Sequence, residues 1–211
     1  ETSQLYPIDP QIDPDIAAQT EPLACVMYSM DMVKPSLADH VLVYGAGPIG
    51  LTYIKVLLAF GIEDFIMAAK GEERVKQAKA CGARYVIDTE KESVPERVSQ
   101  IWGGLADVVI DAVGRGPVLT EAVHLLNSRG RILLFGLDHN ALSQVPPAVY
   151  TQKELTMTGS LGKDFPAAIR LMEDKGIDLK QFVTHRIELD EINRGIGLLR
   201  KKEACRVIVY P

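Results

Sequence analysis

The chain has 211 residues, of which 47% are hydrophobic and 24% are charged. This composition is typical of a globular protein with a sizeable core, and the length suits one large domain or somewhat more. Lys and Arg number 23 against 28 Asp and Glu, a net charge of −5. That balance argues against a nucleic-acid or anionic-membrane surface, because both need basic clusters. No apolar run reaches the roughly 18 residues that a membrane-spanning helix requires, so we expect neither a nucleic-acid partner nor a membrane segment.

The cysteines give a first indication of the compartment. Cys25, Cys81 and Cys205 lie far apart and form no C-x-x-C pair, which fits neither a disulfide framework nor a thiolate zinc site. Free cysteines of this kind favour a reducing, cytoplasmic location. The chain begins with Glu1, and its first methionine is Met27. We therefore expect a part of a longer polypeptide or a processed product, with any targeting signal upstream.

The first 20 residues contain several prolines among acidic residues and predict an extended lead-in. A helix is predicted at 24–32. From residue 41 the chain alternates between short apolar runs and helical patterns. The predicted strands are 41–44, 65–68, 84–87, 107–111, 132–135 and 155–158, and the predicted helices between them are 48–60, 72–81, 92–102 and 118–126. A turn is predicted at 127–130, and the proline-containing segment 144–150 is expected to be a loop.

Strand–helix alternation of this length implies right-handed crossovers and a parallel sheet. Six strands fit two mononucleotide-binding halves. The predicted fold class is therefore α/β, a Rossmann-type doubly wound six-stranded parallel sheet over residues 34–161. The segments 1–33 and 162–211 have no place in that core. They hold helices at 166–174 and 189–202, a strand-like segment at 186–189 and a strand at 205–210, and we expect them to belong to an incomplete second domain.

A G-x-G-x-x-G motif directly follows the first predicted strand and opens the next helix. Gly45 permits a tight turn, Gly47 lets the backbone approach a pyrophosphate, and Gly50 allows close packing of helix and strand. The helix that opens with Pro48 and Ile49 would then receive the anion at its free N–H groups and its positive end. The alternative is a glycine-rich turn without a ligand, but the strand–turn–helix context favours a dinucleotide site.

The second predicted strand ends at Ala68, Ala69 and Lys70. A fold that binds NAD usually places Asp or Glu about 20 residues after the glycine motif, where it bonds the adenosine ribose. That acid is missing here, and Lys70 and Arg74 supply positive charge instead. The pattern favours NADP(H) over NAD(H), because it removes the repulsion of a 2′-phosphate and adds attraction. The alternative is that both cations are solvated residues at a helix start.

The ends of the fourth and fifth strands lie at the carboxyl edge, where ligands bind in open α/β sheets. Residues that could line the nicotinamide side there, or simply belong to the core, are Val113, Gly114, Phe135, Gly136 and Leu137. Asp111 lies at the same edge and could contact a ligand, cap the following helix or have no role. The four histidines are scattered and no zinc spacing exists, so we predict no metal site in this chain.

Several stretches resemble the medium-chain zinc-dependent alcohol and polyol dehydrogenases, most closely the sorbitol dehydrogenase-like branch. They are Glu21–Val26, Val41–Gly50, Ala78–Ala83, Lys153–Ser160 and Val183–Arg186. The resemblance implies an oxidoreductase portion that positions NADP(H) for hydride transfer to or from a secondary alcohol, polyol or ketone. It also implies that zinc is held mainly by an upstream domain that is absent here. The chain alone is therefore expected to be inactive, with zinc only in a full-length parent.

The resemblance also implies roles for individual residues. Glu21 matches a catalytic glutamate near the zinc-bound water and substrate, and Ile49 matches the residue beneath the cofactor. Ala69 and Arg74 match the ribose-recognition positions, and 135–137 match a stretch beside the nicotinamide. The segment 160–163, however, carries neither the arginine nor the aromatic residue of the polyol branch, which weakens a sorbitol-like substrate.

In that family the sixth strand pairs across a two-fold axis, so the strand at 155–160 implies a homodimer or a tetramer. Two other interpretations stay open. One is a stand-alone NADP(H)-binding module without catalysis, and the other is a zinc-independent protein similar to quinone reductases.

Overall fold

The computed structural model describes residues 5–201 and 203–211, which form two compact units. The larger unit spans residues 25–163, and the smaller unit combines the described residues up to 24 with 164–211. The sequence placed these boundaries near 33/34 and 161/162, and the assignment of the outer segments to a catalytic domain stays a prediction. Within the described residues, no helix combines the length and apolar character needed to cross a membrane.

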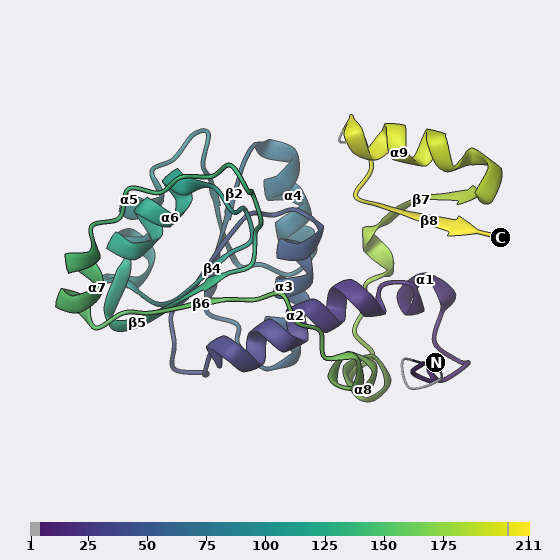
Figure 1. Ribbon diagram of the computed structural model, residues 1–211, viewed down its shortest axis with the longest axis horizontal. Helices are drawn as coiled ribbons and strands as arrows, with labels where there is room; N and C mark the ends of the chain where they lie inside the picture. The colour runs from purple at the N-terminus through teal and green to yellow at the C-terminus, as the bar shows by residue number, and fades with distance from the viewer. Residues whose placement is uncertain (1–4, 202) are drawn as a thin grey trace. The chain divides into compact units, whose positions relative to one another are not determined.

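Six parallel strands form the sheet of the larger unit, in the order β3-β2-β1-β4-β5-β6 (Figure 1). They are β1 (Val41–Tyr44), β2 (Phe65–Ala69), β3 (Tyr85–Asp88), β4 (Ala106–Asp111), β5 (Leu126–Leu134) and β6 (Thr156–Gly159). The order reverses at β1 and β4, which are direct neighbours with Val41 opposite Val108. This is the strand order of a doubly wound Rossmann sheet, so the predicted fold class is confirmed.

Helices cover both faces of this sheet (Figure 1). They are α3 (Pro48–Ala59), α4 (Glu72–Ala80), α5 (Val94–Trp102), α6 (Gly116–His124), α7 (Pro147–Lys153) and most of α2 (Thr20–Val33). Alternation along the strands directs Leu42, Ile66 and Val109 to one face, where Val98 of α5 and Val123 of α6 complete the apolar core. Strands buried on both faces explain why β1 and β2 read as continuous apolar runs.

Two predictions in this unit are wrong. The segment expected to be a loop at 144–150 forms α7 from Pro147 onward, because Pro147 occupies the first helical position, where its missing N–H costs nothing. The turn predicted at 127–130 lies inside β5. Its turn-like residues make the strand irregular: Arg129 has a φ of +63°, and the register against β4 shifts between Ala106 and Val108.

Within the described residues, the smaller unit contains three short helices, two 3₁₀ turns, two strands and the start of α2. These elements are α1 (Pro14–Ala17), α8 (Phe165–Lys175), η2 (Lys180–Phe182), β7 (Val183–Glu188), η3 (Leu189–Glu191), α9 (Ile192–Arg200) and β8 (Arg206–Tyr210). The extended lead-in predicted for 1–20 is therefore wrong from Pro14 on, while residues 1–4 lie outside the described residues. The helix predicted at 189–202 begins only at Ile192, and residue 202 is likewise not described.

Strands β7 and β8 form a two-stranded parallel sheet, and α9 packs on one of its faces. A Cβ on Gly195 would lie 2.6 Å from Ile187 Cδ1, so the glycine allows this close approach. The buried carboxylate of Asp15 accepts hydrogen bonds from Arg186 of β7 and, at 2.6 Å, from the Tyr210 hydroxyl of β8. One side chain of α1 therefore joins both strands.

Candidate functional site

The glycine motif forms the turn between β1 and α3, at the carboxyl end of the central strands. Gly45 has a φ of +99°, a conformation that residues with a Cβ rarely adopt. A Cβ on Gly50 would lie 1.6 Å from the Gly45 carbonyl oxygen, whereas the Cβ position of Gly47 has no neighbour within 4 Å. Gly45 and Gly50 are thus needed for packing, and Gly47 leaves the turn open to an approaching ligand.

Helix α3 begins at this turn with free backbone donors. Its N-cap is Gly47, which has no side chain to satisfy the first amides, and Pro48 follows at the first helical position. Free N–H groups and the positive end of the helix dipole attract an anion. Pro48 and Ile49 are half-buried beside the turn. This arrangement holds the pyrophosphate in dinucleotide-binding folds.

Two cations lie beside the glycine turn, Lys70 directly after β2 and Arg74 on α4. Ala69 is fully buried, whereas Lys70 is exposed, with its Nζ 3.9 Å from a carboxylate oxygen of Glu90. Arg74 donates from Nη1 to the Ala46 carbonyl oxygen at 3.3 Å, so its guanidinium reaches the glycine turn. The sequence already shows that residue 69 is not an acid. It did not predict that Glu90, in the segment after β3, approaches Lys70.

Asp111, at the end of β4, organises the loop that follows it. One of its carboxylate oxygens accepts the amides of Val113 and Gly114 at 2.8 and 2.9 Å. The side chain is almost fully buried, and burial raises its pKa, although the two amide hydrogen bonds act in the opposite direction. Of the three roles left open for Asp111, helix capping is wrong, because the N-cap of α6 is Arg115.

The predicted residues after β4 and β5 meet at the carboxyl edge. A Cβ on Gly136 would lie 2.2 Å from the Gly114 amide nitrogen, so these two glycines bring the loops into contact. The Phe135 ring packs edge-on against Tyr53 of α3, with 5.6 Å between centroids. Leu137 is 69% exposed. Phe135 is thus half-buried against α3, whereas Leu137 is available to a ligand.

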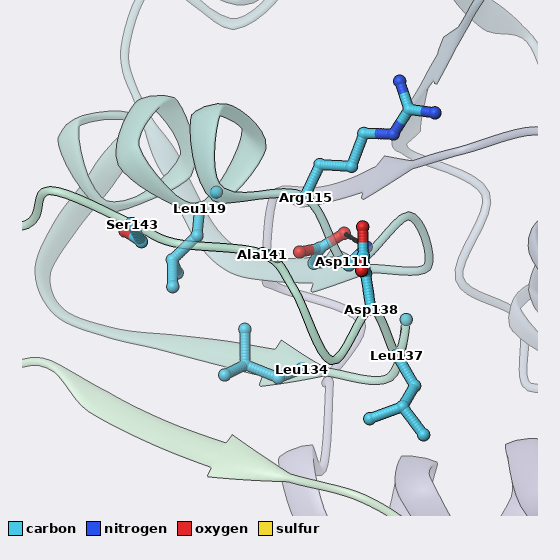
Figure 2. Close-up of a pocket in the computed structure, with 11 residues that line it drawn as sticks. Asp111, Arg115, Leu119, Leu134, Leu137, Asp138, Ala141 and Ser143 are labelled. Atoms are coloured by element: carbon cyan, nitrogen blue, oxygen red, sulfur yellow. Dashed lines mark hydrogen bonds between the residues drawn. The ribbon is translucent and has the colours of Figure 1, made fainter.

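Two cavities open at this edge. The loop cavity, about 170 Å³, lies between α6 and the segment after β5, with Asp111 and Leu137 among its walls. Figure 2 shows the guanidinium of Arg115 extending away from the aliphatic side chains of Leu119 and Leu134. The strand-end cavity, about 270 Å³, lies beside the glycine turn and contains Gly45, Lys70 and Val113 in its walls. Three of the predicted residues thus share one cavity.

Arg115, Thr89 and Glu121 also line the strand-end cavity, and the sequence did not predict them. Arg115 lines the loop cavity as well. Its position directly after Gly114, at the end of a central strand, is a signal that could have identified it. Thr89 follows β3 and Glu121 lies inside α6, where nothing in the local sequence distinguishes them from solvated residues.

Glu21, the predicted catalytic residue, lies in the first turn of α2 and belongs to the smaller unit. Its side chain is exposed, and its negative charge opposes the lowering of the Arg206 pKa that burial causes. No group of three or more His, Cys, Asp or Glu side chains suited to a metal ion exists within the described ranges. Since a catalytic zinc needs about three protein ligands, these residues do not fit a zinc site.

The sheet order, the glycine turn at the start of α3 and the cavities at the strand ends define a Rossmann-type fold, the class that binds dinucleotides in other proteins. The chain belongs to the zinc-binding dehydrogenase family, whose sequence profile matches residues 48–174. It is 31% identical to a sorbitol dehydrogenase of Halalkalibacterium halodurans over 98% of this chain and 62% of that protein. The family suggested by the sequence is thereby confirmed.

Two crystal structures show how closely the fold is shared. One is the short chain alcohol dehydrogenase RspB of E. coli CFT073 complexed with the cofactor NADH, with a TM-score of 0.91 and 29% identity, covering 98% of this chain and 62% of that chain. The other is a zinc-binding dehydrogenase of Sinorhizobium meliloti 1021 bound to NADP. It has a TM-score of 0.90 and 25% identity, covering 99% of this chain and 63% of that chain. The chain thus spans less than two thirds of the length of these relatives.

Proposed function

We propose that this chain is the nicotinamide-dinucleotide-binding part of an alcohol or polyol dehydrogenase whose zinc ligands lie outside these residues. The observation that carries the proposal is the glycine turn, where Gly45 and Gly50 are in contact and Gly47 stays open at the start of α3. Family membership supports it, as do two relatives bound to NADH and to NADP. Substrate chemistry would then take place in the full-length parent enzyme.

Each part of the site has a distinct task in this proposal. The amides at the start of α3 hold the pyrophosphate, the strand-end cavity receives the adenosine, and Val113, Gly114 and the segment 135–137 face the nicotinamide. When bound, the cofactor accepts or donates a hydride at C4 of its nicotinamide ring. The residues of this chain bind and orient that ring, which fixes the face open to an alcohol or ketone.

We further propose that NADP(H) is preferred over NAD(H). Ala69 removes the carboxylate that would repel a 2′-phosphate, and Lys70 and Arg74 place two positive charges beside the glycine turn. Charge-assisted hydrogen bonds to phosphate are among the strongest that side chains make. Glu90 acts against this preference through its contact with Lys70, but it carries one negative charge against two positive ones.

Fluorescence titrations of the protein with NADPH and NADH test both proposals. We expect NADPH to bind at least about tenfold more tightly, and the double variant Lys70→Ala, Arg74→Ala to lose most of that difference. The double variant Lys79→Ala, Arg84→Ala removes the same charge from exposed positions beyond the site and should retain it. Equal affinities in the wild type would overturn the NADP preference, and no saturable binding of either cofactor would overturn the proposed function.

We also propose that the protein forms a homodimer, or a tetramer built from such dimers, through β6. This strand pairs with β5 on one side and is the last strand of the sheet. Thr156, Met157 and Gly159 are exposed along it. An unpaired edge of this kind is ready to pair with a second copy across a two-fold axis.

A further inference from the structure

A tyrosine and a glutamate that lie 77 residues apart in the sequence meet in the wall of the strand-end cavity. Tyr44 is the last residue of β1, immediately before Gly45, and only 3% of its side chain is exposed. Its hydroxyl donates a hydrogen bond of 2.8 Å to Oε1 of Glu121 on α6. Burial raises the pKa of Tyr44 and the charge of Glu121 raises it further, so the phenol stays a donor.

Glu121 has acceptor capacity left for a ligand. The Tyr44 hydroxyl occupies one carboxylate oxygen, and among the described residues no further donor to this carboxylate is found. The other glutamate in the wall, Glu92, differs in this respect. Its Oε2 accepts the Asp88 amide at 3.1 Å and its Oε1 lies 2.8 Å from Arg97 Nε. Glu121 is therefore the carboxylate of this cavity that can receive a donor from a bound molecule.

The rest of the cavity suits a flat, mostly apolar ring. Val94, Val113 and Val118 contribute aliphatic side chains, and Gly45 connects the cavity to the glycine turn. The half-buried Glu121 carboxylate at the wall of such a cavity selects for an N–H donor at the ring edge, because an acceptor that loses water to a ligand without gaining a donor is costly.

We propose that Glu121 accepts a hydrogen bond from the 6-amino group of the cofactor's adenine and so makes the site specific for adenine over 6-oxopurines. Tyr44 acts as a positioning residue that fixes the orientation of the carboxylate. This inference rests on the proposed function, since it requires the adenosine to occupy the strand-end cavity. A 6-oxopurine presents a carbonyl oxygen at the same place, and two acceptors would then face each other.

Paired titrations with NADPH and its hypoxanthine analogue test the inference, because the two molecules differ only along one edge of the purine: the 6-amino donor becomes a 6-oxo acceptor, and N1 gains a proton. The wild type should bind the adenine form at least about tenfold more tightly, since a site built to receive an N–H rejects an analogue that lacks it. Glu121→Gln should bring the two affinities to within about twofold of each other or invert their order, because the amide can donate to the 6-oxo group.

Two further variants complete the experiment. Glu63→Gln removes the same charge from an exposed residue just before β2. This residue lies at the amino ends of the strands, away from the cavity, so the variant should keep the wild-type ratio. Tyr44→Phe removes the hydroxyl that orients Glu121 and should lower the ratio partially, while thermal unfolding confirms that each variant is folded. Tyr44→Phe provides a second measurement of the affinity ratio if Glu121→Gln does not fold.

Each outcome has a separate meaning. A wild-type ratio below about twofold, or a ratio unchanged in Glu121→Gln, would overturn the role of Glu121 while NADPH binding itself upholds the proposed function. If neither dinucleotide binds, the proposed function fails, and the assignment of Glu121 fails with it.

Discussion

The two units of this chain hold their strands together by different means. In the larger unit every residue of β1 and β2 is buried between helices on both faces of the sheet. In the smaller unit all residues of β8 are only half-buried, and the two strands share one fully buried acceptor, the carboxylate of Asp15. One sheet thus depends on a continuous apolar core, whereas the other relies strongly on a polar contact.

This difference implies unequal resistance to opening. Apolar burial adds over many residues at about 25 cal/mol per Å², and in a six-stranded sheet covered on both faces this burial is spread over many side chains. A two-stranded sheet is marginally stable by itself, and loss of the shared acceptor removes the side-chain hydrogen bonds that join Asp15 to both strands. We therefore expect amides of β7 and β8 to exchange with solvent before those of β1 and β2.

The largest effect should come from a position in the larger unit that has no room for a side chain. In Gly50→Ala the added Cβ would overlap the Gly45 carbonyl oxygen, so α3 must move away from the turn. We expect a loss of about 2–4 kcal/mol in the free energy of unfolding and no measurable NADPH binding. Chemical denaturation and fluorescence titration would measure these two quantities.

Gly47→Ala is the matched control, because its Cβ position is free of neighbours and its φ of −79° suits alanine. It should unfold like the wild type but bind the cofactor more weakly, since the new methyl group projects toward the pyrophosphate. Equal loss of stability in both variants would contradict the separate roles assigned to the two glycines.

A somewhat smaller effect is expected in the smaller unit. Asp15→Ala leaves the Arg186 guanidinium and the Tyr210 hydroxyl without their shared acceptor, at a cost of about 2 kcal/mol. Hydrogen exchange should accelerate in β7 and β8 and stay unchanged in β1 and β2. Asp174→Ala, an exposed carboxylate of α8, serves as the control and should change neither. Uniform acceleration across both units would refute the contrast between them.

Acid should reproduce the same contrast. The Tyr210 hydroxyl and Arg186 hold the pKa of Asp15 below 3.8, so its stabilising contribution is complete above that pH and disappears as the pH falls through the lowered value. The pKa of Asp111 is raised by burial, and its contribution has the opposite sign, being present below pH 3.8 and lost as the pH rises through the raised value. Exchange in β7 and β8 should therefore respond to acid first, and this response should vanish in Asp15→Ala.

The difference between local apolar patterns in the larger unit and long-range polar contacts in the smaller unit also explains which elements the sequence could predict. Buried parallel strands are continuous apolar runs, and G-x-G-x-x-G needs no distant partner to form its turn, so the larger unit and the core of its site were predictable. Helix α7 was missed because Pro146 and Pro147, which indicate a loop locally, also suit the start of a helix.

Contacts between distant residues account for the other failures. Asp15 lies in a proline-rich segment that reads as extended, and its role depends on partners 171 and 195 residues away. The contact between Tyr44 and Glu121 likewise depends on the neighbouring positions of β1 and α6. Period and composition carry no information about such pairs, because each partner has an ordinary local sequence.

The smallest effect on unfolding should come from the exposed edge of the larger sheet. Met157→Pro removes at most one backbone hydrogen bond to β5, because β6 has a neighbour on one side only, and we expect a loss of about 1 kcal/mol. Its effect on assembly should be much greater, since a proline ring within the four-residue strand β6 disrupts the pairing of edges. Multi-angle light scattering should show the wild type at twice or four times the chain mass and the variant at the chain mass.

Met157→Ala is the matched control, because it keeps the backbone donor, and it should assemble like the wild type. If the proline variant retains the wild-type mass in solution, β6 is not the interface, and the edge of the larger sheet is protected in some other way.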